Sequence, residues 1–402
     1  MANFSPPQGC LSGLRVLDLS RVLAGPFCTQ ALGDLGAEVI KIESPGRGDD
    51  TRQWGPPWFQ GESAYFLCCN RNKKSVTINL KTEDGRELIR RLMAQCDVVV
   101  ENFKAGALNK YGLDHETMRT LQPRLIYCSI TGYGQDGPYK HLPGYDFIMQ
   151  AQCGMMSITG EAKGEPQKAG VAIADLMSGM YAAHAILAAL YFREKTGTGQ
   201  HIDIALFDAQ ISWLANVAMN YLVSGEPPQR YGNAHPNLVP YQVFVTASDF
   251  IAIGVGNDEQ FRRLCEALGR SDLPRHPDYQ SNPRRVTHRE RLIQDLQTEF
   301  HKQPTTFWLE KMAQAQIPAA PINTVAQALH DPQTQFRGMV QNVRHASGEA
   351  LPLLGPVPKF SHAPAEIRLP PPVLGQHTQE VLQNLLGCEE ASISAWKERG
   401  II

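Results

Sequence analysis

The chain has 402 residues, of which 43% are hydrophobic and 19% charged, which is ordinary usage for a globular protein. Disorder, collagen-like repeats and a coiled coil are therefore excluded as descriptions of the whole chain. The length predicts two or three domains, and 38 Lys and Arg against 40 Asp and Glu give a formal net charge of -2. This balance argues against nucleic acid as a partner, because nucleic-acid-binding proteins usually carry a basic surplus.

Cysteine usage predicts a cytoplasmic protein. The nine cysteines form no CxxC pair and no repeating spacing, as expected of free thiols in a reducing compartment. The first ten residues show neither a secretory signal nor an import sequence.

The longest apolar run, 171–192, contains Asp175, Ser178 and His184. Because a central Asp costs about 2.5–3.5 kcal/mol in a bilayer, the run predicts a buried helix and no membrane partner.

The first 132 residues predict a mostly parallel sheet with helices on both faces, because strand and helix segments alternate. Strands are expected at 15–20, 37–44, 97–102 and 124–132, and helices at 26–35 and 83–95. Pro26 suits the first position of its helix, and Gly36 suits the residue just past its end.

A second unit is expected after 224–241, a stretch rich in Gly, Pro and Asn that is typical of a linker or an active-site loop. A strand at 249–256 and helices at 258–268, 286–302 and 305–316 indicate a small α/β domain. The remaining chain predicts a strand at 317–323, a helix ending near 330, short strands within 339–352 and a last helix at 378–386.

The turn after the first strand, RVLAGPFCTQ (21–30), lies where open α/β sheets usually bind ligands. It lacks GxGxxG, which argues against a dinucleotide site, and on its own it fits an ordinary turn. The sequence also contains no HExxH, no His/Cys spacing for zinc and no GxSxG nucleophile elbow. No metal site is predicted.

Asp175 is an acid within an otherwise apolar segment, and two interpretations are open. It could cap the start of a helix, where Asp is favoured. Alternatively, burial could raise its pKa, and the carboxylate could act as nucleophile or base. Gly170 and Gly179 would let backbone or ligand approach closely, which favours the functional interpretation.

Other polar residues have ordinary structural interpretations beside functional ones. His184 lies on the apolar stretch, where a histidine is more often part of the core than a ligand. Four cations, Arg71, Lys73, Lys74 and Lys81, fit either a solvated face or a phosphate site.

Taken together, motifs along nearly the whole chain resemble the class III CoA-transferases of the formyl-CoA transferase (CaiB/BaiF) type. They include ITGYGQDGP (130–138) and GVAIADLMSGMYAA (170–183). The other stretches that carry the resemblance are 11–57, 70–81, 98–113, 143–160, 195–209 and 371–382.

The resemblance implies a fold and an assembly. It implies a Rossmann-like large domain, a smaller inserted α/β domain and an interlocked homodimer. The large domain would then comprise 1–223 and 326–402, and the small domain with its linkers would comprise 224–325.

The resemblance also implies functional residues. Asp175 matches the catalytic nucleophile of the family. The matching CoA-binding set is Leu23, Ala24, Ile78, Lys81, Asn102, Phe103, Lys110 and Tyr145. Family members often have Gln at the position of Leu23 and a basic residue at that of Ser44, so this chain departs from the pattern there. The implied reaction passes through an aspartyl mixed anhydride and an aspartyl-CoA thioester, with CoA as substrate and no cofactor.

Several alternatives concern the reaction. The segment 230–244 most resembles succinyl-CoA:glutarate transferases and suggests succinyl-CoA as donor and a dicarboxylic acid as acceptor, with Arg52, Arg230 and His235 as candidate carboxylate ligands. A formyl-CoA:oxalate-type transferase is the alternative, although the glycine run of that branch is absent. An α-methylacyl-CoA racemase would need His at Tyr145, and tyrosine is a poor substitute for that base. In a CoA-binding protein without catalysis, Asp175 would only cap a helix.

Overall fold

The computed structural model describes residues 9–402, and the contacts between residues divide the chain into two compact units. Unit 1 contains the described chain up to Cys153, Gly170–Trp213 and Pro332–Ile402, and unit 2 contains Gly154–Ala169 and Leu214–Asp331. The predicted domain boundaries, after residues 223 and 325, stay predictions. The division by contacts places the first boundary ten residues earlier, after Trp213, and the second six residues later, after Asp331. It also assigns 154–169 to unit 2.

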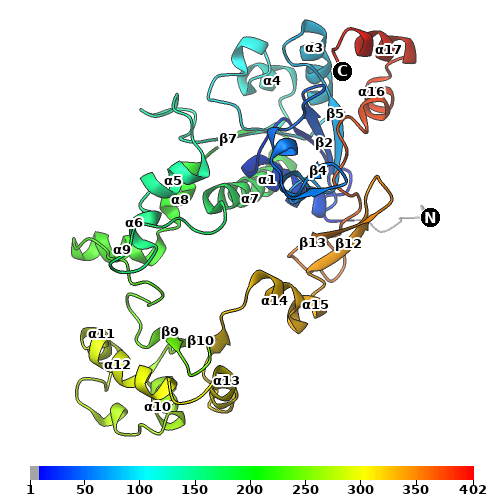
Figure 1. Ribbon diagram of the computed structural model, residues 1–402. Helices are drawn as coiled ribbons and strands as arrows, with labels where there is room; N and C mark the ends of the chain where they lie inside the picture. Colours follow the sequence, from blue (N-terminus) through cyan, green and yellow to red (C-terminus); the bar gives the residue numbers. More distant parts are fainter. Residues whose placement is uncertain (1–8) are drawn as a thin grey trace. The chain divides into compact units, whose positions relative to one another are not determined.

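Unit 1 is built on a six-stranded sheet in the order β5-β2-β1-β6-β7-β8, in which every neighbouring pair is parallel. Strands β2, β5 and β7 of this sheet are labelled in Figure 1. In chain order the strands are β1 (Arg15–Asp18), β2 (Glu38–Glu43), β5 (Lys73–Thr77), β6 (Val98–Glu101), β7 (Ile126–Thr131) and β8 (His201–Ala205). Their apolar residues are buried on both faces, as parallel strands covered by helices require. The expected α/β class with a parallel central sheet is confirmed.

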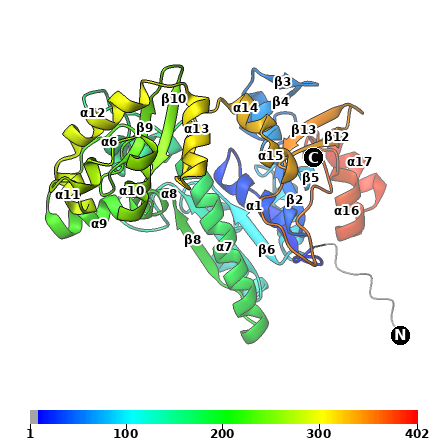
Figure 2. The same cartoon turned by 90° about the horizontal axis from the view of Figure 1, so that it is seen from below.

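Helices cover both faces of this sheet. Alternate strand residues, such as Val98 and Val100, pack under α1 (Ala24–Asp34) and α7 (Ile173–Thr196), which runs beside β8 in Figure 2. The residue between them, Val99, packs with the opposite layer. That layer consists of α3 (Glu83–Met93), α4 (His115–Leu121), α16 (Thr378–Leu386) and α17 (Glu390–Glu398).

Gly179 allows α1 and α7 to pack closely. A Cβ atom at Gly179 would lie 2.5 Å from the carbonyl oxygen of Ala24, so any larger residue would push the two helices apart. This contact fixes the first turn of α1 against the second turn of α7, one turn after Asp175. The close approach that the sequence suggested for Gly179 is therefore made by backbone.

Unit 1 also contains shorter elements. They are η1 (Asp50–Gln53), the hairpin β3 (Trp58–Phe59) and β4 (Glu62–Ser63), α2 (Ala64–Leu67), η2 (Asn109–Tyr111), α5 (Asp146–Gln152), α8 (Leu206–Ser212), α15 (Pro332–Phe336) and the hairpin β12 (Val340–Arg344) and β13 (Ala350–Leu354).

Fully buried ion pairs connect the strands to the turn between β1 and α1. Lys73 Nζ lies 3.0 Å from Asp18 Oδ2 and also donates to the carbonyl oxygen of Pro26. Lys41 Nζ lies 2.9 Å from Asp49 Oδ2 and donates to the carbonyl oxygen of Ser20. Burial alone would raise the pKa of Asp18, but the charges of Lys73 and Lys41 lower it to about 2. Asp18 is thus held as a carboxylate under the turn.

Unit 2 has its own sheet and core. Three antiparallel strands, β9 (Tyr241–Val245), β10 (Phe250–Gly254) and β11 (Ala319–Pro321), pack with helices around Phe244, Phe261 and Phe300. The helices of unit 2 are α6 (Met155–Ile158), α9 (Ala215–Ser224), α10 (Asp258–Ala267), η3 (Leu273–Arg275), α11 (Asn282–Thr287), α12 (Arg289–Phe300), α13 (Thr305–Gln314) and α14 (Val325–His330).

Three sequence-based expectations for the elements are wrong. The helix expected at 286–302 is two helices, separated at His288. Pro26 is the third residue of α1, where it is tolerated because N–H groups of a first turn have no acceptor within the helix. His184 is exposed, because α7 turns one face away from the sheet.

Length and composition alone would allow α7 to cross a membrane. In unit 1, however, its residues Ala174, Ala182, Ile186 and Leu190 are buried against α1 and the sheet, as in the core helix of a globular unit.

Candidate active site

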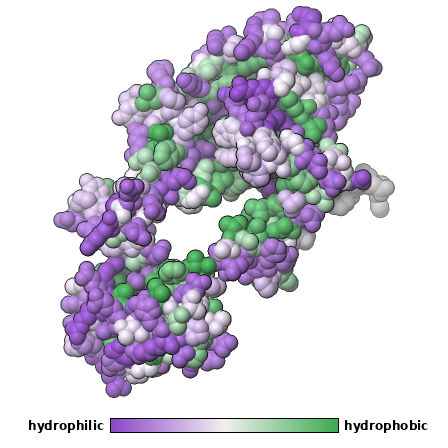
Figure 3. Space-filling model, viewed as in Figure 1, coloured by the Kyte–Doolittle hydropathy of each residue, from purple (hydrophilic) through white to green (hydrophobic). Residues whose placement is uncertain are grey.

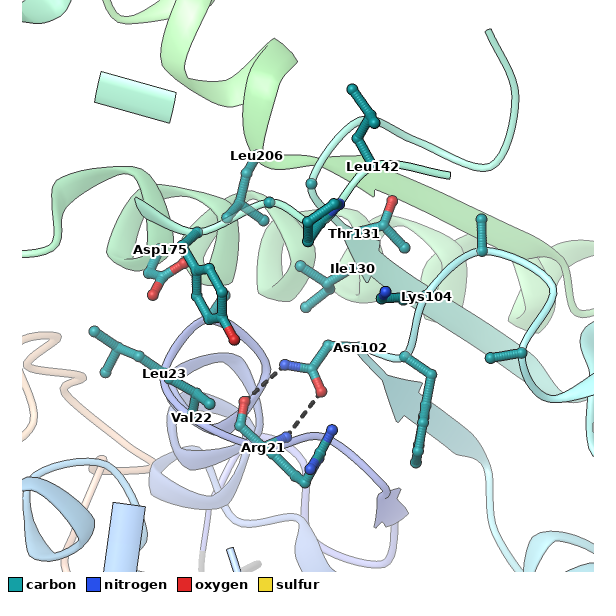
Figure 4. A pocket seen from close by; sticks show the side chains of 18 of the residues that line it. Arg21, Val22, Leu23, Asn102, Lys104, Ile130, Thr131, Leu142, Asp175 and Leu206 are labelled. Carbon is teal, nitrogen blue, oxygen red and sulfur yellow. Dashed lines mark hydrogen bonds between the residues drawn. The ribbon is translucent and has the colours of Figure 1, made fainter. Parts of the chain in front are cut away.

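Two adjoining cavities lie at the carboxyl ends of the unit 1 strands, where parallel α/β sheets usually bind ligands. The Asp175 cavity, of about 400 Å³, is lined by segments that follow β1, β6, β7 and β8 (Figure 4). The Lys81 cavity, of about 450 Å³, is lined by segments that follow β1, β2, β5 and β6. Arg21, Asp50, Phe103 and Ala107 line both, so one extended ligand could occupy the two.

The residues that the resemblance assigned to CoA binding come together in these cavities. Leu23, Ala24, Asn102 and Tyr145 line the Asp175 cavity, and Ile78, Lys81 and Lys110 line the Lys81 cavity. Phe103 belongs to both. These residues belong to the four segments that follow β1, β5, β6 and β7, and all four segments leave the same edge of the sheet. Their binding of CoA stays a prediction.

Asp175 is the third residue of α7, and it does not cap that helix. The capping position is Ala172, and no side chain at that position bonds the first turn. Instead, Asp146 at the start of α5 accepts a hydrogen bond of 2.7 Å from the backbone N–H of Ala174. The structural interpretation of Asp175 as a cap is therefore wrong. Asp146 thus accepts an N–H of the first turn of α7 from outside that helix. The Asp175 side chain is left to face the cavity (Figure 4).

The Asp175 carboxylate has no hydrogen-bond or ion-pair partner among residues 9–402. Burial and the neighbouring negative charge of Asp146 raise its pKa to about 7. No cation offsets this rise. A carboxylate near its pKa at neutral pH, without a partner and open to a cavity, is poised to react as a base or a nucleophile.

The charge of Asp175 also acts on Tyr65 of α2, a residue that the sequence analysis did not single out. Burial and the charge of Asp175 raise the pKa of the Tyr65 hydroxyl well above its usual range. Its ring packs edge-on against Trp54 at 5.1 Å between centroids. No sequence signal pointed to Tyr65, because it lies in the short helix α2, which follows the short strands β3 and β4, and the sequence predicts none of these elements.

Cations in the two cavities differ in whether an acid already pairs with them. Arg21 Nη1 lies 2.9 Å from Asp50 Oδ2, and Arg47 also reaches Asp50. Lys104 and Lys140 line the Asp175 cavity, and Lys81 lines the Lys81 cavity. Within the described chain, the side chains of these three lysines have no acidic partner. They are available for an anionic ligand.

Other cations of the sequence analysis serve the fold. The Arg71 guanidinium pairs with buried Asp34, Lys73 with Asp18, and Lys74 with Glu38 and Glu380. Lys81, the fourth of these cations, lines the cavity that is named after it.

The three candidate ligands for an acceptor carboxylate are bonded elsewhere. Arg52 is buried, bonds Glu43, Glu62 and the carbonyl oxygen of Pro372, and lines neither cavity. In unit 2, Arg230 donates to three backbone carbonyls, and His235 Nδ1 accepts two backbone N–H groups. Their role toward a substrate stays a prediction without support from these contacts.

A family model described as CoA-transferase family III matches residues 11–378. The chain belongs to this family. The expected enzyme class, a CoA-transferase, is thereby confirmed.

Known members resemble this family III chain over nearly its full length. A protein of Agrobacterium fabrum named succinate–glutarate CoA-transferase is 48% identical, covering 96% of this chain and 97% of its own. A human protein named succinyl-CoA:glutarate CoA-transferase is 42% identical, covering 100% of this chain and 91% of its own. The solved structure of a CaiB/BaiF family protein from Brucella suis is 47% identical, with a TM-score of 0.82 over 94% of this chain and 99% of that one.

Proposed function

We propose that this family III CoA-transferase moves CoA from succinyl-CoA to a dicarboxylic acid such as glutarate. The observation that carries the proposal is the unpaired Asp175 carboxylate in a cavity that adjoins a second, cation-lined one. The names of the Agrobacterium and human relatives support the choice of donor and acceptor. An acyl-CoA would place its thioester beside Asp175 and its phosphates near Lys81 and Lys110.

In the proposed first half-reaction, the Asp175 carboxylate attacks the thioester carbonyl of the donor. The carbon–sulfur bond breaks, CoA thiolate leaves, and a mixed anhydride joins the donor acyl group to Asp175. The thiolate then attacks the aspartyl carbonyl, which releases the donor acid and forms an aspartyl-CoA thioester. The pKa of about 7 at Asp175 supports this role, because a more basic carboxylate is a better nucleophile and still ionises at neutral pH.

In the proposed second half-reaction, the carboxylate of the acceptor attacks the aspartyl thioester and expels CoA thiolate. The thiolate attacks the acceptor carbonyl of the resulting anhydride, which yields the new acyl-CoA and regenerates Asp175. Every step exchanges a carboxylate or thiolate at a carbonyl, so the scheme requires no change of oxidation state. We therefore propose that the enzyme needs no metal or redox cofactor.

For the second carboxylate of the acceptor, we propose Lys140 as the partner. Lys140 lines the same cavity as Asp175, and its side chain has no acidic partner among the described residues. In the proposed complex, the carbon chain of the acceptor would cross the cavity between Asp175 and Lys140. Lys104 belongs to the segment that continues toward the Lys81 cavity, whereas the segment 140–145 leads directly into α5 and Asp146. This chain connection to Asp146 favours Lys140 over Lys104 for the proposed role.

We propose a homodimer in the cytoplasm, with a second copy packing on the outer face of α7. Met180, His184, Leu187 and Tyr191 form an exposed, largely apolar stripe at helical spacing, with Tyr191 68% exposed. Figure 3 shows further exposed hydrophobic side chains over α15, where Phe336 is 86% exposed. The nine cysteines, all within the described chain, are free thiols, which supports a reducing compartment.

Replacing Asp175 with Asn or Ala should lower the transfer rate at least about 10³-fold, because the nucleophile is lost. Wild-type protein mixed with succinyl-CoA and quenched with hydroxylamine should carry a hydroxamate on Asp175, visible by peptide mass spectrometry. Asp136→Asn, an exposed carboxylate, is the matched control and should react normally. Retained turnover in Asp175→Asn would contradict the nucleophile role and favour a binding function.

The rate should fall as the pH drops below about 7, because protonation removes the nucleophilic carboxylate. Asp146→Asn should shift this acidic limb of kcat/KM to lower pH, since it removes the negative charge that disfavours ionised Asp175. Its amide oxygen can still accept the Ala174 N–H. Asp136→Asn should leave the limb in place. An unchanged limb in Asp146→Asn would show that Asp175 does not govern the profile.

The wild-type enzyme should use glutarate with kcat/KM at least about tenfold above that for pentanoate, which has the same chain length but one carboxylate. Lys140→Met should remove this preference by raising the KM for glutarate, and Lys397→Met, an exposed lysine on α17, should not. Equal losses with both acids in Lys140→Met would refute its assignment. A wild-type preference for pentanoate would refute a dicarboxylate acceptor.

Light scattering should give the wild-type protein about twice the chain mass of 44.5 kDa. Leu187→Glu combined with Tyr191→Glu should reduce the dimer fraction, because two charges would enter the apolar stripe. Lys397→Glu on α17 serves as the surface control. A single-chain mass for the wild-type protein would contradict the proposed assembly.

A further inference from the structure

Val22, in the turn between β1 and α1, has a backbone conformation that its side chain disfavours. Its φ is +71°, in the left-handed region, where a β-branched residue meets steric conflict. Such residues persist only where the surroundings hold them, and they concentrate at functional sites. Val22 and the next two residues, Leu23 and Ala24, line the Asp175 cavity.

The side chain of Asn102 holds the residue before Val22 with two hydrogen bonds, drawn in Figure 4. Asn102 Oδ1 accepts from the backbone N–H of Arg21 at 2.8 Å, and Asn102 Nδ2 donates to the carbonyl oxygen of Arg21 at 2.7 Å. Backbone pairing between β1 and β6 ends just before, where the N–H of Leu19 donates to Val100. The Asn102 amide thus continues the parallel ladder beyond the last backbone pair.

These bonds fix the peptide plane on which the φ of Val22 depends. The carbonyl of Arg21 and the N–H of Val22 belong to one peptide group. Asn102 Nδ2 binds its oxygen, and Asp49 Oδ1 accepts its N–H at 3.2 Å. Asp49 is buried and paired with Lys41, so this second anchor is itself held. The peptide group before Val22 is therefore held by one hydrogen bond at its oxygen and another at its N–H.

Asn102 is also held in place. It follows Glu101, the last residue of β6, whose buried carboxylate accepts the backbone N–H of Phe103 at 2.8 Å. The peptide group before Asn102 thus continues directly from β6, and the peptide group after it donates its N–H to the side chain of Glu101. The sheet edge, Asn102 and the turn form a chain of contacts that ends at the Asp175 cavity.

We propose that Asn102 is a positioning residue, whose amide keeps Val22 in the left-handed turn and thereby sets where Leu23 and Ala24 face Asp175. This inference rests on the proposed function for its activity readout. It differs from the expectation that Asn102 only contacts CoA, because it places the effect on the reaction step rather than on acyl-CoA affinity.

A double-mutant cycle between Asn102 and Val22 tests the proposal. Asn102→Ala should lower kcat by about 10–100-fold, the cost of a misplaced reacting group, with the KM for succinyl-CoA changed less than about threefold. Val22→Gly supplies the second background of the cycle, because glycine adopts a φ of +71° without a Cβ conflict and so needs no support from Asn102. The double variant should recover at least about tenfold in kcat over Asn102→Ala. Asn109→Ala, an exposed asparagine on η2, is the matched control and should change neither parameter.

Two results would overturn the proposal. One is a rise in KM with unchanged kcat in Asn102→Ala, which would make Asn102 a direct CoA contact. The other is a double variant no more active than Asn102→Ala.

A second readout separates this inference from the proposed function. If neither wild type nor Val22→Gly transfers CoA from any donor, the proposed function fails. The same cycle measured by urea unfolding then tests the positioning role: Asn102→Ala should destabilise the wild-type protein more than it destabilises the Val22→Gly variant. Equal destabilisation in both backgrounds would overturn the inference, and the unfolding curves also show whether Asn102→Ala folds.

Discussion

The buried ion pair between Lys73 and Asp18 is the constraint on which the site depends. It crosses from β5 to β1 and, through the bond from Lys73 Nζ to the carbonyl of Pro26, reaches the first turn of α1. Removing two charges from water is costly, and a buried pair often adds little net stability. Here the pair holds the β1–α1 turn in position. Lys73 Nζ donates to Asp18 Oδ2, the carbonyl oxygen of Pro26 and Asn70 Oδ1, and these three bonds together fix the arrangement of the turn. Leu23 and Ala24 enter the Asp175 cavity from that turn.

Asp18 and Asp175 show how surroundings give one residue type two behaviours. Both are shielded from water, which disfavours a charged carboxylate. Around Asp18, two lysines and two hydroxyl groups outweigh this effect, and its pKa falls to about 2. At Asp175 the charge that acts is that of another acid, Asp146, and the pKa of Asp175 rises to about 7. The first acid is inert and structural, whereas the second is left with the reactivity that a carboxylate nucleophile needs.

Much of the sheet could be predicted from the sequence, because β1, β2, β6 and β7 are short apolar runs between helices. The strand β5 was missed, since Lys73 and Lys74 at its start look solvent-exposed until Asp18 is known to lie beside them. The motif resemblance named residues that do line the two cavities, because those residues follow strand ends. It could not show that Asp146 caps α7, or that Arg52 is bonded to Glu43, since both contacts join segments whose approach depends on the folded sheet.

The distribution of cations explains how a chain with a net charge of -2 can serve anionic ligands. Arg52, Arg71, Lys41 and Lys73 are buried and matched to acids, so they contribute to the fold and offer no net field. Lys81, Lys104 and Lys140 are left unmatched among the described residues, and they lie in the two cavities. An anion that enters therefore meets uncompensated positive charge at the cavity walls. In the Asp175 cavity the anion also meets the unpaired Asp175 carboxylate. In the proposed reaction, the group that approaches this carboxylate is a thioester carbonyl carbon and not an anion.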